Sequence, residues 1–302
     1  MIDEVQSGPI STVRGIVPGT STADLYVCAL RVNECNMPAV NILCVFATLM
    51  LLCVRAEYPT CGGCWCVPDG AADCPSDWVP ETVYSDEVIA KYSNMRPSFV
   101  YQLDCNPYTT LDCTTTPPQI MIDSTTAVCA TVYKDDTCNE YNMVTYSSIE
   151  EALQNPKAEV SHSGACGLCS TTKDFAVYLT EDFTSAGKIC ATKGLFNETA
   201  GLDCYMGIGL TKECAKIWNY DGIYDGKMCS KTCLPYLNAP NNGPPPACDL
   251  NPCLECDEEY AGPIFSSFAA RTRRRSGLLS EIIRNCSSIS HLNHNPCDFC
   301  VC

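Results

Sequence analysis

The chain has 302 residues, 26 of them cysteines, and a formal net charge of −16 at pH 7. The cysteine content approaches that of a disulfide scaffold, but the length exceeds that of a mini-protein and allows a sizeable core. The acidic balance disfavours nucleic acid and anionic lipid as partners and favours cations or basic partners. Because persistent disulfides require an oxidising compartment, we expect an exported protein.

Residues 37–56 carry the expected export signal. The apolar run of residues 42–54 has the length of a signal-peptide core and is too short for an ordinary membrane span, and VRA at 54–56 is typical of a cleavage site. We therefore interpret residues 1–36 as an upstream extension of the reading frame, with Met37 as the working start. An uncleaved signal anchor, which would leave the protein lumenal and membrane-tethered, is the alternative.

Cleavage after residue 56 would remove four cysteines and leave 26 − 4 = 22, an even number that allows complete pairing. It would also remove four acidic and three basic residues, so the formal charge would change from −16 to −15. The mature form would then have no membrane span. Two N-glycosylation sequons begin at Asn197 and Asn285, and the first lies in polar sequence that favours a surface position.

Residues 57–97 are expected to form a cysteine-rich knot followed by coil and a short helix over residues 85–94. The knot holds Cys61, Cys64, Cys66 and Cys74. The C-x-x-C spacing within it also suits zinc, but in an exported chain it favours disulfides. We expect no metal and no cofactor.

Residues 98–160 are expected to form a small antiparallel sheet. Strand-like sequence occupies residues 99–103, 127–133 and 143–146, and four cysteines would staple the sheet: Cys105, Cys113, Cys129 and Cys138. A short helix capped by Ser147 should follow and end near residue 154.

The segment of residues 162–183, HSGACGLCSTTKDFAVYLTEDF, starts the helical region of residues 161–302. Thr171 and Asp174 have the spacing of a helix N-cap and a first-turn carboxylate. Apolar residues then recur at helical spacing on one face. Cys166 and Cys169 precede the cap, where the helix dipole would favour a thiolate, and His162 is near both in sequence.

Three interpretations of this pair compete. Residues 164–170 resemble the segment around the nucleophile of the papain family, although Ser170 stands where that family has Trp and Ser163 where it has the oxyanion Gln. The resemblance would imply a thiol peptidase, with His291 or His294 and Asn295 downstream as partners. The C-x-x-C spacing would also suit a dithiol oxidoreductase. We favour structural disulfides over both.

Residues 187–209 have the composition of a connecting region. Thr211 should cap a helix that Gly222 stops, and Cys229 and Cys233 would face one neighbour at helical spacing. Residues 238–246, NAPNNGPPP, are a loop or linker. Asn251-Pro252 begins a further helix, which Gly262-Pro263 breaks or kinks before a second amphipathic run.

Three arginines follow this run at helical spacing, Arg271, Arg274 and Arg275, and would project together in an otherwise acidic protein. We rank ion pairs with the protein's own carboxylates first, an anion or sulfated-glycan site second and proteolytic processing at RTRRR third. The tail HLNHNPCDFCVC could suit a transition metal, but we favour disulfides to the body.

Five motifs occur in this order along the chain: HSGACGLCSTTKDFAVYL, GLTKECAKIW, CSKTC, NPCLECDEEYAGPIF and ARTRRRSGL. Over the second half of the chain they resemble a set of uncharacterised secreted cysteine-rich proteins of unicellular eukaryotes, a resemblance that implies no activity. We predict a disulfide-rich α+β protein with a small antiparallel sheet followed by a mainly helical region. Its expected function is that of a secreted or cell-surface structural or binding protein without catalysis, with an unknown extracellular ligand or protein as partner. The alternative is a secreted thiol enzyme using Cys169 or Cys166 with His162 or a C-terminal histidine.

Overall fold

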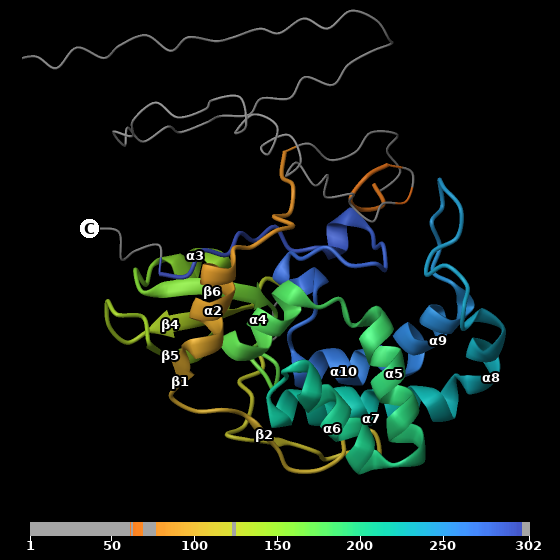
Figure 1. Ribbon diagram of the computed structural model, residues 1–302. Helices are drawn as coiled ribbons and strands as arrows, with labels where there is room; N and C mark the ends of the chain where they lie inside the picture. The colour runs from red at the N-terminus through yellow and green to blue at the C-terminus, as the bar shows by residue number, and fades with distance from the viewer. Residues whose placement is uncertain (1–60, 62, 69–76, 123–124, 298–302) are drawn as a thin grey trace, which may run out of the picture. The chain divides into compact units, whose positions relative to one another are not determined.

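The computed structural model describes residues 61, 63–68, 77–122 and 125–297, which all belong to the compact unit Arg55–Cys302. The predicted export signal and residues 1–36 lie outside the described residues. The fold is α+β (Figure 1) and disulfide-rich, as predicted. The strands are β1 (Arg96–Pro97), β2 (Gln102–Leu103), β3 (Thr115–Thr116), β4 (Val128–Tyr133), β5 (Glu140–Tyr146) and β6 (Ala158–Ser163).

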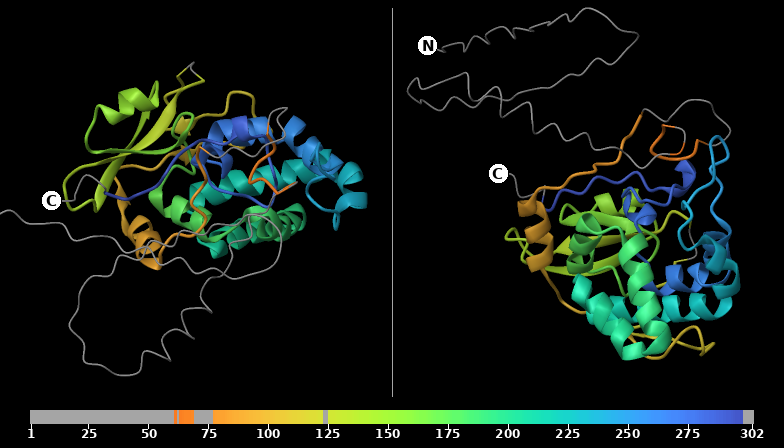
Figure 2. Two further views of the ribbon diagram at one scale, coloured as in Figure 1. Left: turned by 90° about the horizontal axis from the view of Figure 1, so that it is seen from above. Right: turned by 45° about the vertical axis from the view of Figure 1, so that its right-hand side comes forward.

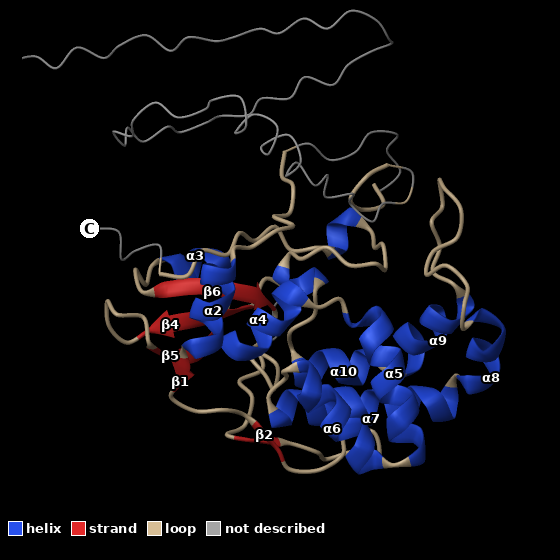
Figure 3. Cartoon of the chain, in the orientation of Figure 1, coloured by secondary structure: helices blue, strands red, loops and turns tan. Residues whose placement is uncertain are grey.

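The α-helices are α2 (Asp86–Asn94), α3 (Ile149–Leu153), α4 (Thr172–Thr180), α5 (Phe183–Phe196), α6 (Glu198–Ile208), α7 (Lys212–Met228), α8 (Ser230–Cys233), α9 (Pro252–Tyr260) and α10 (Gly262–Ala269). Short 3-10 turns are η1 (Leu234–Tyr236), η2 (Arg274–Ser276) and η3 (Cys286–Ser288). Strands β1, β4, β5 and β6 gather on one side of the unit and helices α5–α10 on the other (Figure 3), and two further views agree (Figure 2). Within the described ranges, no helix is both long and apolar enough to cross a bilayer.

The larger sheet has the strand order β1-β5-β4-β6. Strand β4 pairs antiparallel with β5 and β6, whereas β1 pairs parallel with β5, so the sheet is mixed rather than antiparallel. The alternating, largely apolar sequence of β4 suits this central position, because both of its edges are paired and five of its six residues are buried. Strands β2 and β3 form a separate two-stranded ladder.

Helix caps explain where several helices begin. Thr171 caps α4 through the backbone N–H of Asp174, and Asn251 caps α9, as the sequence predicts. Ser85 caps α2, the short helix expected over residues 85–94. Ser148 rather than the predicted Ser147 caps α3, because its side chain accepts the hydrogen bond from the Glu151 N–H.

Residues 187–209 form helices α5 and α6 rather than the predicted connecting region. Glycines in this segment serve close helix packing instead of a loop. A Cβ atom at Gly201 would lie 2.5 Å from the Cα of Gly194, so the two backbones pack together without side chains. Asn197 ends α5 and caps α6, which makes the two helices a hairpin.

Helix α7 continues through Gly222, which the sequence suggests as its end. A Cβ atom there would lie 2.6 Å from the Cβ of Ala191 on α5. The glycine therefore lets α7 approach α5, and the helix ends only at Met228. Thr211 lies at its N-cap, but its side chain accepts no hydrogen bond from the first turn; the hydroxyl donates to Asp174.

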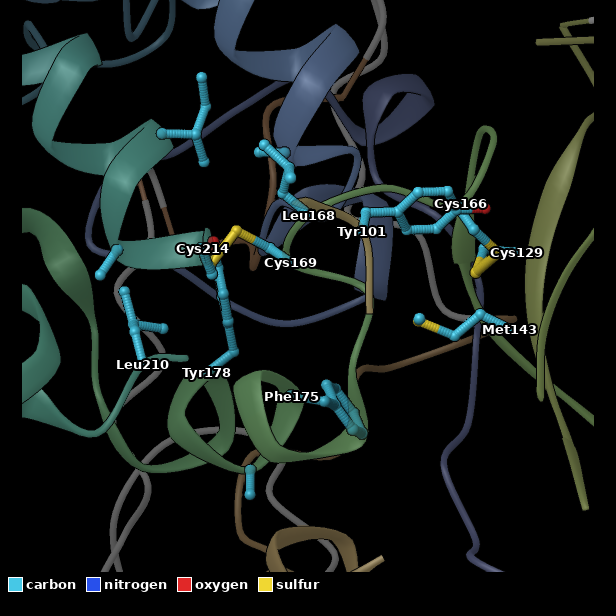
Figure 4. Packing of buried hydrophobic residues seen from close by; sticks show 14 of the residues in the cluster. Tyr101, Cys129, Met143, Cys166, Leu168, Cys169, Phe175, Tyr178, Leu210 and Cys214 are labelled. Atoms are coloured by element: carbon cyan, nitrogen blue, oxygen red, sulfur yellow. A yellow bond between two sulfur atoms is a disulfide. The ribbon is translucent and has the colours of Figure 1, made fainter. Parts of the chain in front are cut away.

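Disulfides connect distant parts of the unit rather than stapling the sheet internally. One disulfide joins Cys129 of β4 to Cys166, and a second joins Cys169 to Cys214 of α7. Both lie within the buried core (Figure 4). Of the four predicted sheet staples, only the pair Cys105–Cys113 is local. The remaining pairs between described residues are Cys61–Cys248, Cys66–Cys286, Cys138–Cys297, Cys190–Cys204, Cys229–Cys256 and Cys233–Cys253. The predicted N-terminal knot is thus tied to the second half of the chain.

Candidate functional site

The residues of the predicted thiol site occupy a closed part of the core. Cys166 and Cys169 are fully buried and both form disulfides. The His162 ring is also fully buried; its Nδ1 lies 2.9 Å from the Ser163 carbonyl oxygen and its Nε2 lies 2.7 Å from Ser170 Oγ. Burial lowers the pKa of His162 well below 6.5, so the ring is neutral and serves as a hydrogen-bonded core residue.

The three arginines of the predicted anion site do not project together. Helix α10 ends at Ala269 because Ala270 has a φ of 67°, so the helical spacing that relates Arg271 to the others is lost. Arg271 is fully buried. Arg275 donates to the carbonyl oxygens of Ser266 and Ala270. Within the part of the chain that the structure describes, Arg274 is the one of the three that forms the predicted ion pair, with Glu258.

Arg271 instead connects the sheet to the helical region. Its guanidinium donates to the Ser161 carbonyl and hydroxyl of β6, to the carbonyls of Cys169 and Ser170, and to Ser276 Oγ. It also lies 4.5 Å from the centre of the Phe175 ring. A planar group with five N–H donors can satisfy several buried oxygens at once, which is what this position requires.

Both predicted glycosylation sites are exposed. Asn197 caps α6 and its side chain accepts from the Ala200 N–H. Asn285 begins the turn η3, and its neighbour Cys286 is in a disulfide with Cys66.

A pocket of about 200 Å³ lies elsewhere, among α5, α7, α9, α10 and the segment of residues 272–284. Its wall combines aromatic, acidic and basic side chains. The lining residues are Tyr178, Asp182, Phe183, Thr184, Trp218, Asp221, Asp257, Glu258, Gly262, Phe265, Ser266, Thr272, Arg273, Arg274, Ser280, Ile282 and Arg284.

One wall carries a pair of carboxyl groups, Asp221 of α7 and Asp257 of α9. Burial, together with repulsion from neighbouring carboxylates, raises the pKa of Asp257 to about 7 and that of Asp221 well above its usual 3.8. Burial also raises the pKa of Asp225, one helical turn after Asp221, to about 6. The pair therefore retains a proton near neutral pH, as interacting carboxyl groups do.

Tyr108 gives Asp221 a hydrogen-bonded arrangement in either protonation state. Its hydroxyl lies 2.7 Å from Asp221 Oδ1 and 3.2 Å from the Ala261 carbonyl oxygen. When Asp221 is ionised, the tyrosine can donate to it. When Asp221 is protonated, the acid can donate to the tyrosine oxygen, and the tyrosine then donates to Ala261.

A second part of the wall, next to the carboxyl pair, is basic. Glu258 joins two arginines: its Oε1 lies 2.7 Å from a terminal nitrogen of Arg284 and its Oε2 lies 3.3 Å from one of Arg274. Arg273 donates to three backbone carbonyls, those of Leu279, Tyr178 and Glu181, and lies 3.5 Å from Asp182.

The apolar part of the pocket is built around Trp218. Its ring stacks on Phe183, with centroids 5.0 Å apart, and on Tyr205, with centroids 6.0 Å apart. Phe265 packs edge-on at 4.6 Å, and the indole N–H donates to the Tyr178 hydroxyl. Because these aromatic neighbours pack against the Trp218 ring, this part of the pocket wall is an aromatic cluster and not a single exposed indole face.

Disulfides hold the acidic wall in place. Cys229 and Cys233 bond to Cys256 and Cys253 of α9, as the prediction that both face one neighbour implies. The residue after Cys256 is Asp257, so these bonds fix the carboxyl against α7.

The sequence signal for this acidic wall was the repeat YDG at residues 220–222 and 224–226, which places Asp221 and Asp225 on one helix face. Their partner Asp257 lies more than thirty residues downstream, and no periodicity connects them.

Within the described ranges, no group of three or more His, Cys, Asp or Glu side chains is placed to hold a metal ion.

A family model described as a family of unknown function (DUF8771) matches residues 198–292. The matched segment contains every lining residue of the pocket except Tyr178, Asp182, Phe183 and Thr184. No curated protein and no solved structure matches the chain.

Proposed function

We propose that this chain is an extracellular, disulfide-stabilised binding protein without catalysis, and that the pocket beside Asp257 holds its ligand. The observation that carries the proposal is the pocket itself, because apolar, acidic and basic groups from separate elements converge on one cavity. Small-molecule sites are concave, largely apolar and supplied with a few oriented polar groups.

Rigid construction supports binding at this position. The disulfides Cys229–Cys256 and Cys233–Cys253 cross-link the helices of the acidic wall. A site that is formed before the ligand arrives avoids the cost of ordering its side chains on binding.

The extracellular part of the proposal rests on the cross-links. Nine disulfides join described residues, and several join segments more than a hundred residues apart. Such bonds persist only in oxidising compartments.

The alternative of a secreted thiol enzyme receives less support. Its two sulfurs, those of Cys166 and Cys169, are buried in disulfides, and a thiolate is the form that thiol catalysis requires. Both ring nitrogens of His162 are already engaged, with the Ser163 carbonyl and the Ser170 hydroxyl.

A fragment screen on the native, oxidised protein by ligand-observed NMR tests the binding function. The variant Ile282→Trp places a larger side chain at a position that lines the cavity, and so fills the pocket. The matched control is Ile120→Trp, at a side chain that is 61% exposed and does not line the pocket. We expect fragments that bind the wild type and the control but not the filled variant. Absence of any fragment with this pattern would contradict the proposal.

A further inference from the structure

The basic wall has more positive charge than its own carboxylate balances. Arg274 and Arg284 share Glu258, with each oxygen of that carboxylate directed to one guanidinium. A guanidinium has five N–H donors, and among the described residues Glu258 is the one ion-pair partner of each of these two arginines. Donors in this planar fork match a carboxylate or a similar oxyanion.

The third arginine of the pocket does not contribute to this excess. Arg273 uses its N–H groups on backbone carbonyls and has Asp182 as its charge partner. The positive charge that Glu258 alone does not balance is therefore located at Arg274 and Arg284, beside the carboxyl pair.

The carboxyl pair decides whether an anion can enter. The charged and titratable groups that face Asp257 are Asp221 and Asp225 on α7, Glu258 on α9, and Arg274 and Arg284 in the segment of residues 272–284; Tyr108 faces Asp221. With one proton retained, the pair carries one negative charge instead of two, so it repels an anion less and can donate a hydrogen bond. Once both carboxyls are ionised, their negative charge opposes an anion in the same cavity.

Size and surface define the rest of the ligand. A cavity of about 200 Å³ is somewhat larger than one of about 150 Å³ that holds benzene. Phe183, Phe265 and Ile282 supply apolar contacts for a body of about one ring.

Resting on the binding function proposed above, we infer that the ligand is a small organic acid with a compact apolar body, bound at Arg274 and Arg284 in the cavity that Asp221 and Asp257 also line. Because the anion meets less repulsion while the carboxyl pair keeps a proton, its binding is linked to one bound proton. The affinity should fall as the pH rises above about 7, by up to about tenfold per pH unit.

Three probes of similar shape and different charge test this inference: benzoate, benzyl alcohol and benzylamine. Binding to the oxidised protein is measured by isothermal titration calorimetry at about pH 6 and about pH 8, where benzoate stays ionised. We expect benzoate to bind best, and at least about tenfold more tightly at the lower pH. Preferential binding of benzylamine or benzyl alcohol would overturn the inference and leave the binding function standing. If none of the three probes binds although the fragment screen finds other pocket ligands, the inference is also overturned and the binding function stands. If the screen itself finds none, both proposals fail.

Two variants locate the effect. Arg284→Gln should weaken benzoate binding about tenfold or more, whereas Arg96→Gln, at an exposed site outside the pocket, should not change it. Asp257→Asn should still bind benzoate but lose most of the pH dependence, and exposed Asp203→Asn should keep it. If Arg284→Gln does not fold, the pH profile of Asp257→Asn decides. A profile equal to that of the wild type would overturn the inference.

Discussion

Replacing Asp257 by asparagine removes a carboxyl group that the fold holds in an unfavourable place. Burial, then the charges of Asp225 and Glu258, raise its pKa from an ordinary 3.8 to about 7. The folded chain thus binds more protons than the unfolded chain between about pH 4 and about pH 7, so the contribution of this group to stability is lost as the pH rises through that window. At about 1.4 kcal/mol per pKa unit, the loss above pH 7 is about 4 kcal/mol.

We therefore expect Asp257→Asn to gain stability over the wild type as the pH rises, by about 4 kcal/mol between about pH 4 and about pH 8. Urea unfolding of the non-reduced proteins at a series of pH values measures it. The comparison must be with the wild type at each pH, because buried His294, whose pKa burial lowers to about 4, acts in the opposite direction. Asp203→Asn, at an exposed position, is the control. If the unfolding free energies of Asp257→Asn and the wild type stay parallel over this range, Asp257 does not hold a proton in the folded protein and the reasoning is wrong.

Three further predictions concern the core and its cross-links. Arg271→Lys should lower the free energy of unfolding by about 3 kcal/mol or more, since lysine cannot reach the several buried oxygens that the guanidinium satisfies; a loss below about 1 kcal/mol would contradict that role. The double variant Cys233→Ser with Cys253→Ser opens a bond that spans 20 residues and should cost about 3 kcal/mol, measured as a shift in the denaturation midpoint. Alkylation and peptide mapping of the non-reduced protein should find no free thiol at Cys166 or Cys169, and an alkylated cysteine at either position would revive the thiol enzyme.

Local chemistry explains which elements could be predicted from sequence. The beginnings of α2, α4 and α9 depend on Ser85, Thr171 and Asn251, whose side chains accept hydrogen bonds from the first turn and do so whatever the rest of the chain does. The apolar sequence of β4 likewise fits a strand at the centre of a sheet. These signals act over three or four residues and are visible in the sequence alone.

Predictions failed where a residue serves a distant neighbour. The glycines of residues 187–209 have the composition of a loop, yet Gly194 and Gly201 are present because two helix backbones meet there. Arg271 has the spacing of a surface patch, yet the positive φ of Ala270 ends the helix and the arginine is buried.

The sequence by itself determined that the protein is α+β, rich in cysteine and built from well-capped helices, because composition and caps are local properties. It could not show which sulfurs bond, since pairing depends on which segments meet in space. The tertiary structure alone placed Asp221 beside Asp257 and set Arg274 and Arg284 against one shared carboxylate. Proximity between segments far apart in the chain raises the pKa values and creates the pocket, and no pattern along the chain encodes it.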